Sequence, residues 1–444
     1  MTAPRARLAA LAVLVASVFG CASRHRPAAA GLDAVAERYV RLVLAMGRHD
    51  KDYVDAYYGP KPLKEEAERD SVPLVVILRT ADSLAAALGS TPPAGADELT
   101  GLRHRYLERQ LQALAARARM LSGEKLSFDQ ESQALYDAVA PTLPDSAFAP
   151  ALARIDSLLP GKGPLADRWD VFQKAFMIPP AKLDTVFRVA IAEARRRTRA
   201  HLTLPDSESF TVEYVKHQPW GGYNWYQGGY RSLIQVNTDL PIYLDHVLGL
   251  ACHEGYPGHH VYNMLLEQAL VRERGWKEFT VYALFSPQSL IAEGTAVVAP
   301  DVAFPGQERA RFEKHVLCPL AGLDTSRYGR YEQVHDAIDS LSMANIQAVR
   351  RWLDGRSSRE ETVQWLMRND LRTRERAEKD LSFAERYRSY VVNYGLGRRM
   401  VLAWLAANGG DAAHPDRRWQ LYQTLLASPR LPQDLVPQPL TASR

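Results

Sequence analysis

The sequence lacks a strong net charge and, after its first 20 residues, any long apolar run. Removing Arg5 and Arg7 of the leader takes two positive charges from the net charge of +4 and leaves +2. A charge so close to zero argues against a nucleic-acid partner. No later stretch approaches the roughly 18 apolar residues that a membrane-spanning helix needs, so we expect no such helix after the leader.

Three common signatures are also absent: a Walker phosphate loop, a nucleotide-binding GxGxxG and a GxSxG nucleophile elbow. Cysteine is scarce, and besides Cys21 the sequence holds only Cys252 and Cys318. They are either free buried thiols or one disulfide, and their spacing does not decide which. We do not expect Cys252 to bind a metal together with His253, because neighbouring helix positions face about 100° apart.

The N-terminus has the pattern of an export signal. Two arginines precede an apolar run over residues 8–19, which ends at Gly20-Cys21. We expect residues 1–20 to be a signal peptide, Cys21 to be lipidated, and residues 21–32 to be a tether. The protein would then be a lipoprotein in a bacterial cell envelope, held by this anchor on the periplasmic side or in the outer membrane. An ordinary secreted signal peptide is the alternative.

The most informative stretch is HEGYPGHH, at residues 253–260. It holds three of the 12 histidines, where even scattering would place roughly 0.2. Histidines clustered beside a glutamate indicate a metal site, because both are common zinc ligands. The alternative is that these histidines cap a helix end next to an ordinary Pro-Gly turn.

The spacing of these histidines is unusual. Zinc hydrolases commonly place two His four residues apart on one helix, with a Glu beside the first as general base. His259 and His260 follow His253 by six and seven residues, a rise of about 9 to 10.5 Å on an unbroken helix. Pro257 lacks an N–H for the His253 carbonyl and crowds it. We therefore expect a bulge or break after Glu254 that returns His259, or alternatively His260, to the ion.

A carboxylate on a later helix is the candidate third ligand. Glu293 shares one face of the segment 286–300 with apolar residues, and a charge there needs a partner or a metal. We predict that Glu293 is the third ligand and that the fourth position is left for water. The alternatives are a buried salt bridge from Glu293 to an Arg, and Glu267 as the ligand, although Glu267 has the pattern of an exposed helical charge.

The rest of the chain is mostly helical in pattern. Residues 33–204 are predicted to be helical throughout, as scaffold and wall of a cleft. Aromatic and β-branched residues over 209–237 predict a small antiparallel sheet of two or three strands, either purely structural or able to bind an extended peptide at its edge. Helices are expected over 238–254, where His246 is interpreted as a packing or metal-supporting residue, and over 305–319, 327–353, 358–369, 373–390 and 396–428.

With these residues in hand, the sequence resembles the domain of unknown function 885 family over roughly residues 205–410. The resemblance rests on His253-Glu254, Pro257-Gly258-His259-His260 and Glu293-Gly294. Members of the family are bacterial, often lipoproteins, and similar to HExxH-type metallopeptidases with a Glu third ligand. By this resemblance His253, His259 and Glu293 bind Zn²⁺, Glu254 is the general base, and Tyr394 is the family's late Tyr.

The sequence also departs from the family after Glu293. Thr295, Val298 and Pro300 replace the family's Trp, Tyr and second acidic residue. These differences bear on the residues that support the ligands and on the substrate pocket.

We therefore predict a mostly α (α+β) fold, with a small antiparallel sheet beside a metal-binding helix and a gluzincin-like active-site cleft. Residues 205–444 would form the catalytic metallohydrolase half. The predicted reaction is zinc-assisted hydrolysis of a peptide or small amide, with Glu254 moving the proton and Tyr394, beside flexible glycines, holding the oxyanion. The alternatives are an ester or cell-wall amide substrate, or a non-catalytic envelope lipoprotein with a structural or vestigial metal site.

Overall fold

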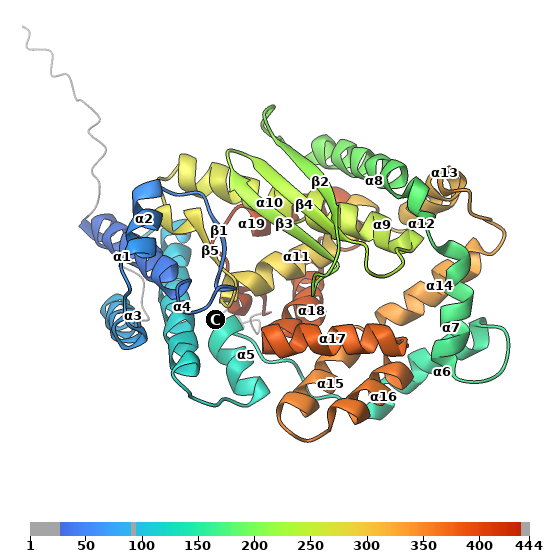
Figure 1. The fold of residues 1–444 in the computed structure, drawn as a ribbon. Helices are drawn as coiled ribbons and strands as arrows, with labels where there is room; N and C mark the ends of the chain where they lie inside the picture. Colours follow the sequence, from blue (N-terminus) through green and yellow to red (C-terminus); the bar gives the residue numbers. More distant parts are fainter. Residues whose placement is uncertain (1–26, 90–94, 437–444) are drawn as a thin grey trace, which may run out of the picture.

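The computed structural model describes residues 27–89 and 95–436 (Figure 1). The predicted signal peptide, the predicted lipidation site at Cys21 and the first part of the tether lie outside the described residues. The first helix begins at Pro27, inside the segment that the sequence suggested as a tether. None of the described helices is long and apolar enough to cross a membrane.

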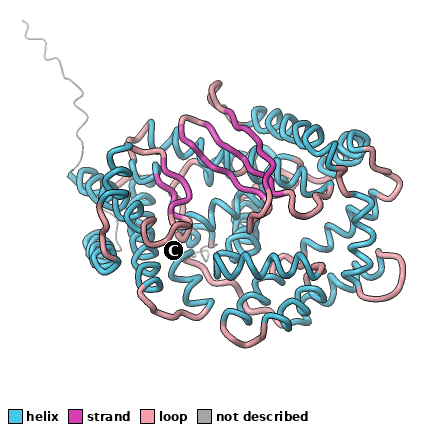
Figure 2. The backbone as a smooth tube through the Cα atoms, viewed as in Figure 1, coloured by secondary structure: helices cyan, strands magenta, loops and turns pink. Residues whose placement is uncertain are grey.

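The fold is mostly α, as predicted, with two small sheets that lie against the helices (Figure 2). The α-helices are α1 (Pro27–Met46), α2 (Lys61–Arg69), α3 (Leu74–Leu88), α4 (Glu98–Leu121), α5 (Phe128–Tyr136), α6 (Ala149–Leu158), α7 (Leu165–Gln173), α8 (Pro180–His201), α9 (Leu244–Leu250), α10 (His259–Leu266), α11 (Pro287–Ala303), α12 (Glu308–Phe312), α13 (Cys318–Ala321), α14 (Tyr328–Asp339), α15 (Ala344–Leu353), α16 (Arg359–Asn369), α17 (Arg374–Tyr387), α18 (Val392–Ala407) and α19 (Pro415–Leu426).

A three-stranded sheet lies beside α10, with strands in the order β2 (Ser209–Val215), β4 (Arg231–Asn237), β3 (Gly222–Gly228) (Figure 1). The strands β3 and β4 form the antiparallel hairpin that the sequence predicts, and β2 adds to β4 in parallel. That parallel pairing was not predicted, because it depends on the connection that carries β3 to the far side of β4.

A second, two-stranded sheet joins distant parts of the chain. Strand β1 (Val54–Tyr57) pairs antiparallel with β5 (Val281–Ala283) and lies beside β3. The prediction that residues 33–204 are helical throughout was wrong here, because the strand is specified by a partner more than 220 residues later and not by its own four residues. The N-terminal half therefore supplies one strand of a sheet to the half that carries the histidines.

Helix α11 lies at the centre of the fold and is buried along almost its whole length (Figure 1). It packs closely against α18, where a Cβ on Gly397 would lie 2.9 Å from the Cα of Gly294. A Cβ on Gly395 would likewise lie 2.4 Å from the carbonyl oxygen of Ser342. The predicted helix start at residue 396 was therefore wrong: α18 begins at Val392, and these glycines allow close helix packing instead of a flexible break.

Candidate metal centre

The helix that carries His253 breaks where the sequence predicts. Helix α9 is followed by a π-helical turn over Ala251–Gly255, and α10 begins at His259. The Tyr256–Pro257 peptide bond is cis. A Cβ on Gly258 would lie 1.9 Å from the carbonyl oxygen of His253, so only glycine fits where the chain folds back.

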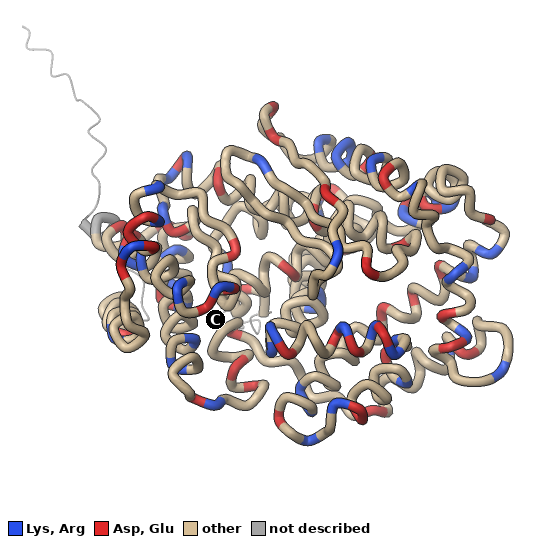
Figure 3. The backbone as a smooth tube through the Cα atoms, viewed as in Figure 1, with Lys and Arg blue, Asp and Glu red and all other residues tan. Residues whose placement is uncertain are grey.

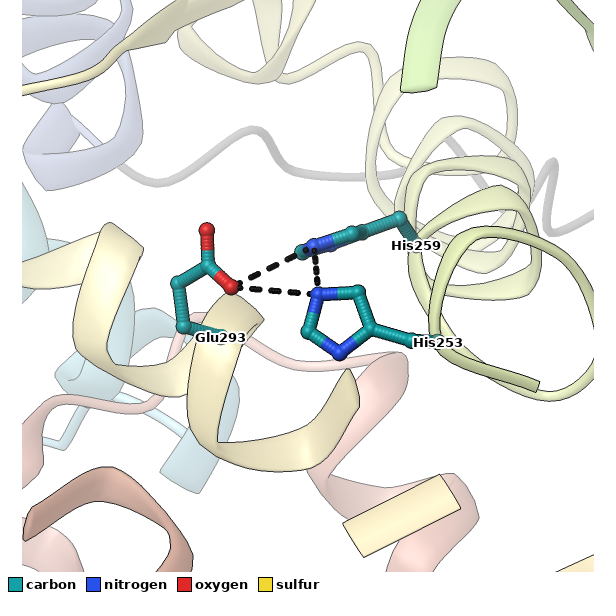
Figure 4. Close-up of side chains that lie close together, drawn as sticks. All are labelled: His253, His259 and Glu293. Atoms are coloured by element: carbon teal, nitrogen blue, oxygen red, sulfur yellow. Dashed lines mark hydrogen bonds and ion pairs between the residues drawn. The ribbon is translucent and has the colours of Figure 1, made fainter. Parts of the chain in front are cut away.

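This reversal brings the two imidazoles together. The Nε2 atoms of His253 and His259 lie 3.1 Å apart. Oε2 of Glu293, on α11, lies 3.3 Å from Nε2 of His253 and 3.5 Å from Nε2 of His259. Figure 4 shows the three side chains pointing at one another from separate segments. The structure thus gathers the three residues that the sequence analysis selected as ligands.

Glu293 is held in a way that leaves one oxygen for a metal. Its Oε1 accepts a 2.7 Å hydrogen bond from the Tyr390 hydroxyl. Its Oε2 is buried and makes no hydrogen bond of good geometry to any residue that the structure describes. Burial alone would raise the pKa of Glu293, but the imidazoles of His259 and His253 outweigh it and hold that pKa well below its usual range.

The alternatives for the ligands lie elsewhere. His260 is fully buried, with Nδ1 2.9 Å from the Ser232 hydroxyl and Nε2 3.2 Å from Glu208. Glu267 is paired with Arg272 and is buried, so its expected exposure was wrong. The nearest charged partner of His246 is Asp245, at 3.1 Å, and His246 lines the cleft without reaching the three ligand atoms.

Glu254 lies beside the three ligand residues. It is 4 % exposed, and its Oε1 is 3.9 Å from Nε2 of His253. Its backbone carbonyl accepts a hydrogen bond from Nδ2 of Asn224, and a Cβ on Gly222 would come within 2.8 Å of its Oε1. Burial raises the pKa of Glu254 to about 7. A carboxyl group with this pKa can accept a proton near neutral pH.

Tyr394 is half-buried on α18, and its ring centroid is 6.5 Å from that of His253. Its hydroxyl makes no hydrogen bond within the described part of the chain, so this donor is free. Burial, and then the charge of Glu293, raise the pKa of Tyr394 well above its usual value. Tyr394 therefore stays a neutral hydroxyl near the three ligand atoms.

The spacing of the three ligand atoms fits zinc. Four-coordinate zinc with bonds of about 2.0 to 2.1 Å places its ligand atoms about 3.3 to 3.4 Å apart. The distances between the three atoms are 3.1, 3.3 and 3.5 Å. One of these atoms is Oε2 of Glu293, which has no hydrogen-bond partner among the described residues. Among the described residues the group has three members, which leaves a fourth position without a protein ligand.

Two spaces adjoin the site, and both are lined in part by His253, Glu254 and Tyr394. A small cavity of about 60 Å³ is lined by the three ligand residues together with Glu254 and Tyr394. A cleft of about 700 Å³ begins at His253, Glu254 and Tyr394 and extends past α17. Charges of both signs alternate along α17 (Figure 3).

Two residues of the site were missed by the sequence analysis. Tyr390 stands four positions before Tyr394, a helical spacing that would have placed both near one site. Asp55, on β1, lines the small cavity and accepts a hydrogen bond from the Tyr223 hydroxyl. Burial raises the pKa of Asp55 to about 6. Nothing in the sequence around residue 55 marks it as a site residue.

The departures from the family pattern lie mostly behind the site. Thr295 and Val298 are fully buried and line neither space. The Thr295 hydroxyl donates to backbone carbonyls of its own helix, and its carbonyl accepts from Tyr422. Pro300 lines the large cleft. Of these three residues, only Pro300 contributes to the surface of the two spaces.

No family model and no curated protein matches the chain. Solved structures show a low overall similarity to it. A protein from Colwellia psychrerythraea, provisionally described as a lipoprotein, has a TM-score of 0.45 and 16 % identity over 89 % of this chain and 74 % of its own. Another from Shewanella oneidensis, also provisionally described as a lipoprotein and of unknown function, has a TM-score of 0.42 and 12 % identity, over 82 % of this chain and 76 % of its own. The protein CHT has a TM-score of 0.48 and 11 % identity, over 90 % of this chain and 92 % of its own.

Proposed function

We propose that this protein is a zinc-dependent hydrolase that cleaves a peptide or small amide. The observation that carries the proposal is the triangle of His253 Nε2, His259 Nε2 and Glu293 Oε2, with the Glu254 carboxylate beside it. A bound zinc ion would polarise the substrate carbonyl and lower the pKa of a water molecule to about 7. Side chains of the protein would transfer the proton, stabilise the oxyanion and hold the metal ligands in place.

Glu254 is the general base and then the general acid. It takes the proton of the attacking water and passes it to the nitrogen of the leaving amine. Its burial supports this role, because a carboxyl whose pKa is about 7 both accepts and releases a proton near neutral pH.

Two tyrosines complete the proposed site. The free hydroxyl of Tyr394 donates a hydrogen bond to the substrate oxygen as that oxygen gains negative charge. Tyr390 keeps Glu293 in place through its bond to Oε1, so that Oε2 stays directed at the two imidazoles.

The open fourth position favours a catalytic over a structural metal site. Structural zinc sites are commonly closed by four protein ligands, whereas catalytic sites keep one position open. The described residues supply three ligands next to a cavity and a long cleft. The pattern of the first 21 residues supports a place in the bacterial cell envelope, with the protein anchored through Cys21.

The proposal is tested by measuring the zinc content of the purified protein and of three variants. We expect close to one zinc per chain, and loss of zinc in His253→Ala and in Glu293→Ala. His246→Ala is the matched control, because it removes an imidazole that lines the cleft away from the ligand atoms. Little zinc in the wild type after zinc addition, or equal zinc in every variant, would contradict the proposal. Peptides, amides and esters are then compared as substrates of the zinc-loaded protein.

A further inference from the structure

The small cavity has an unusual balance of charge. Three carboxylates line it, from Asp55, Glu254 and Glu293, and none of the described residues that line it is Lys or Arg. If the two imidazoles bind as neutral ligands, one divalent ion leaves these groups with a net charge of −1 when all three carboxyls are ionised and of 0 when Glu254 holds a proton. The lining carries no net positive charge in either state, so it does not repel a ligand that carries one.

Asp55 is the carboxylate of the three with no proposed role in the reaction. The Tyr223 hydroxyl is the only described side chain that hydrogen-bonds it, through Oδ1. Asp55 Oδ2 is thus left available as an acceptor on the cavity wall. Asp55 is carried by β1, which is paired with β5 and lies beside β3, so the carboxylate sits on a rigid element.

A second acceptor on the same wall lacks a partner. Asn224 is 7 % exposed and lines the cavity. Its Nδ2 is fixed by the 2.7 Å bond to the carbonyl of Glu254, and its Oδ1 has no hydrogen-bond partner among the described residues. Two acceptors without matching donors indicate a ligand that donates N–H groups.

Aromatic rings complete the enclosure. The rings of Phe383 and Tyr387 are 4.6 Å apart, and Phe383 is 6.2 Å from Tyr394. Trp220 and Tyr282 also line the cavity. Ring faces attract cations, and the attraction grows when water is excluded.

The large cleft differs from the small cavity in the charge of its lining and in its size. Its lining contains cationic side chains, and each is already paired with a carboxylate or a backbone carbonyl: Arg398 with Asp301 at 3.0 Å, Lys379 with Asp239 at 3.2 Å. The cleft is also more than ten times larger than the small cavity. The small cavity thus has room for one small group at the end of a substrate, whereas the cleft accommodates an extended remainder.

We propose that Asp55 binds a protonated amine of the substrate, with the free α-amino group of a peptide as its ligand, so that the enzyme removes residues from the N-terminus. This inference rests on the proposed function for the direction of cleavage. An ammonium group at the end of a lysine-like side chain shares the same chemistry, and the size of the cavity favours the shorter α-amine.

The test measures ligand binding by calorimetry at pH 7, in Glu254→Gln protein so that nothing is hydrolysed. The probes are leucinamide, N-acetyl-leucinamide and N-acetyl-lysinamide, each with and without zinc. We expect leucinamide to bind about tenfold or more tightly than its acetylated form, since a hydrogen bond to a charged group is lost on acetylation. Tighter binding of N-acetyl-lysinamide than of leucinamide would instead assign the site to a side-chain amine.

Two further substitutions locate the effect. Asp55→Asn keeps an acceptor for Tyr223 and removes the charge, so we expect the preference for the free amine to disappear while zinc content is unchanged. Tyr223→Phe is the matched control, because it removes the hydrogen bond between the two side chains and leaves the charge of Asp55, so the preference should remain.

Equal binding of leucinamide and its acetylated form would overturn the inference, as would a preference that survives Asp55→Asn. Binding is measured without zinc as well, so a protein that binds no zinc would count against the proposed function and would still report on Asp55. A loss of zinc in Asp55→Asn would show that Asp55 supports the metal centre instead, and would also overturn the inference.

Discussion

His259 and His260 are neighbours in the sequence, yet they belong to two clusters of opposite character. His259 faces His253 and Glu293, beside a cavity, where one buried carboxylate oxygen has no hydrogen bond. His260 faces Glu208, and both of these side chains are buried. The same residue types therefore form both a candidate metal centre and an ordinary buried polar network.

The difference lies in how completely the polar atoms are satisfied. Oε2 of Glu208 accepts hydrogen bonds from Tyr256 at 2.5 Å and from His260 at 3.2 Å, and Oε1 accepts from Arg195 at 2.8 Å. No residue of this Glu208 cluster lines the small cavity or the cleft. A complete set of partners needs no ligand, whereas Oε2 of Glu293 needs one.

The largest expected effect is on catalysis by Glu254→Gln. Loss of the proton-transferring group should lower kcat by about 10² to 10⁴-fold, while zinc content stays at the wild-type value. The measurement is single-turnover hydrolysis of the best substrate, with zinc determined in the same sample. Comparable turnover by this variant would refute the role of Glu254.

The distinction between the two clusters is tested most directly by replacing His259 and His260 with alanine, one at a time. His259→Ala should lose zinc and the rise in thermal stability that zinc gives, which is about 4 kcal/mol at a thousand times the dissociation constant. His260→Ala should keep its zinc but unfold more easily, by about 1 to 3 kcal/mol, because Glu208 loses a buried partner. Calorimetric scans with zinc and with a chelator separate the two effects. The reverse pattern would show that the ligands are misassigned.

A pair of matched tyrosine substitutions, one in each cluster, tests the same distinction through the affinity for zinc. Tyr390→Phe removes the bond to Oε1 of Glu293 and should weaken zinc binding by about 10 to 100-fold. Tyr256→Phe removes the bond to Glu208 and should leave the zinc affinity unchanged. Competition with a chromophoric chelator gives both affinities, and equal losses in the two variants would contradict the distinction between the clusters.

The smallest effect concerns pH. Burial alone would raise the pKa of Glu208, but hydrogen bonds from His260, Tyr256 and Arg195 outweigh it and lower that pKa. The stability that ionised Glu208 contributes should thus be complete above the ordinary Glu pKa and be lost as the pH falls through the lower, folded-state pKa. Urea unfolding between pH 7 and pH 3 should show a shallower acid decline in Glu208→Gln. An identical decline in both proteins would argue against this contribution.

The three candidate ligands could be selected from the sequence because their signals are local. Pro257 removes one backbone donor and crowds one carbonyl, so the break after Glu254 follows from covalent chemistry. Glu293 stood out because a charge on an apolar helix face needs a partner. Both inferences depend on residues within two helical turns of each other.

The residues that were missed depend on distant partners. Asp55 lies on a strand that forms because β5 pairs with it, and no local sequence pattern predicts that pairing. The glycines of α18 were interpreted as flexible, although Gly397 is needed for contact with Gly294 on another helix. Whether a glycine loosens a chain or permits a close contact is decided by what packs against it.

The strand pairing of β1 with β5 has a consequence for the protein during its synthesis. The proposed centre draws on residues from Asp55 to Tyr394, so the ribosome must reach Tyr394 before every part is present. A nascent chain that has exposed both histidines still lacks Glu293, Tyr390 and Tyr394. A site assembled in this way stays incomplete until the ribosome has passed Tyr394.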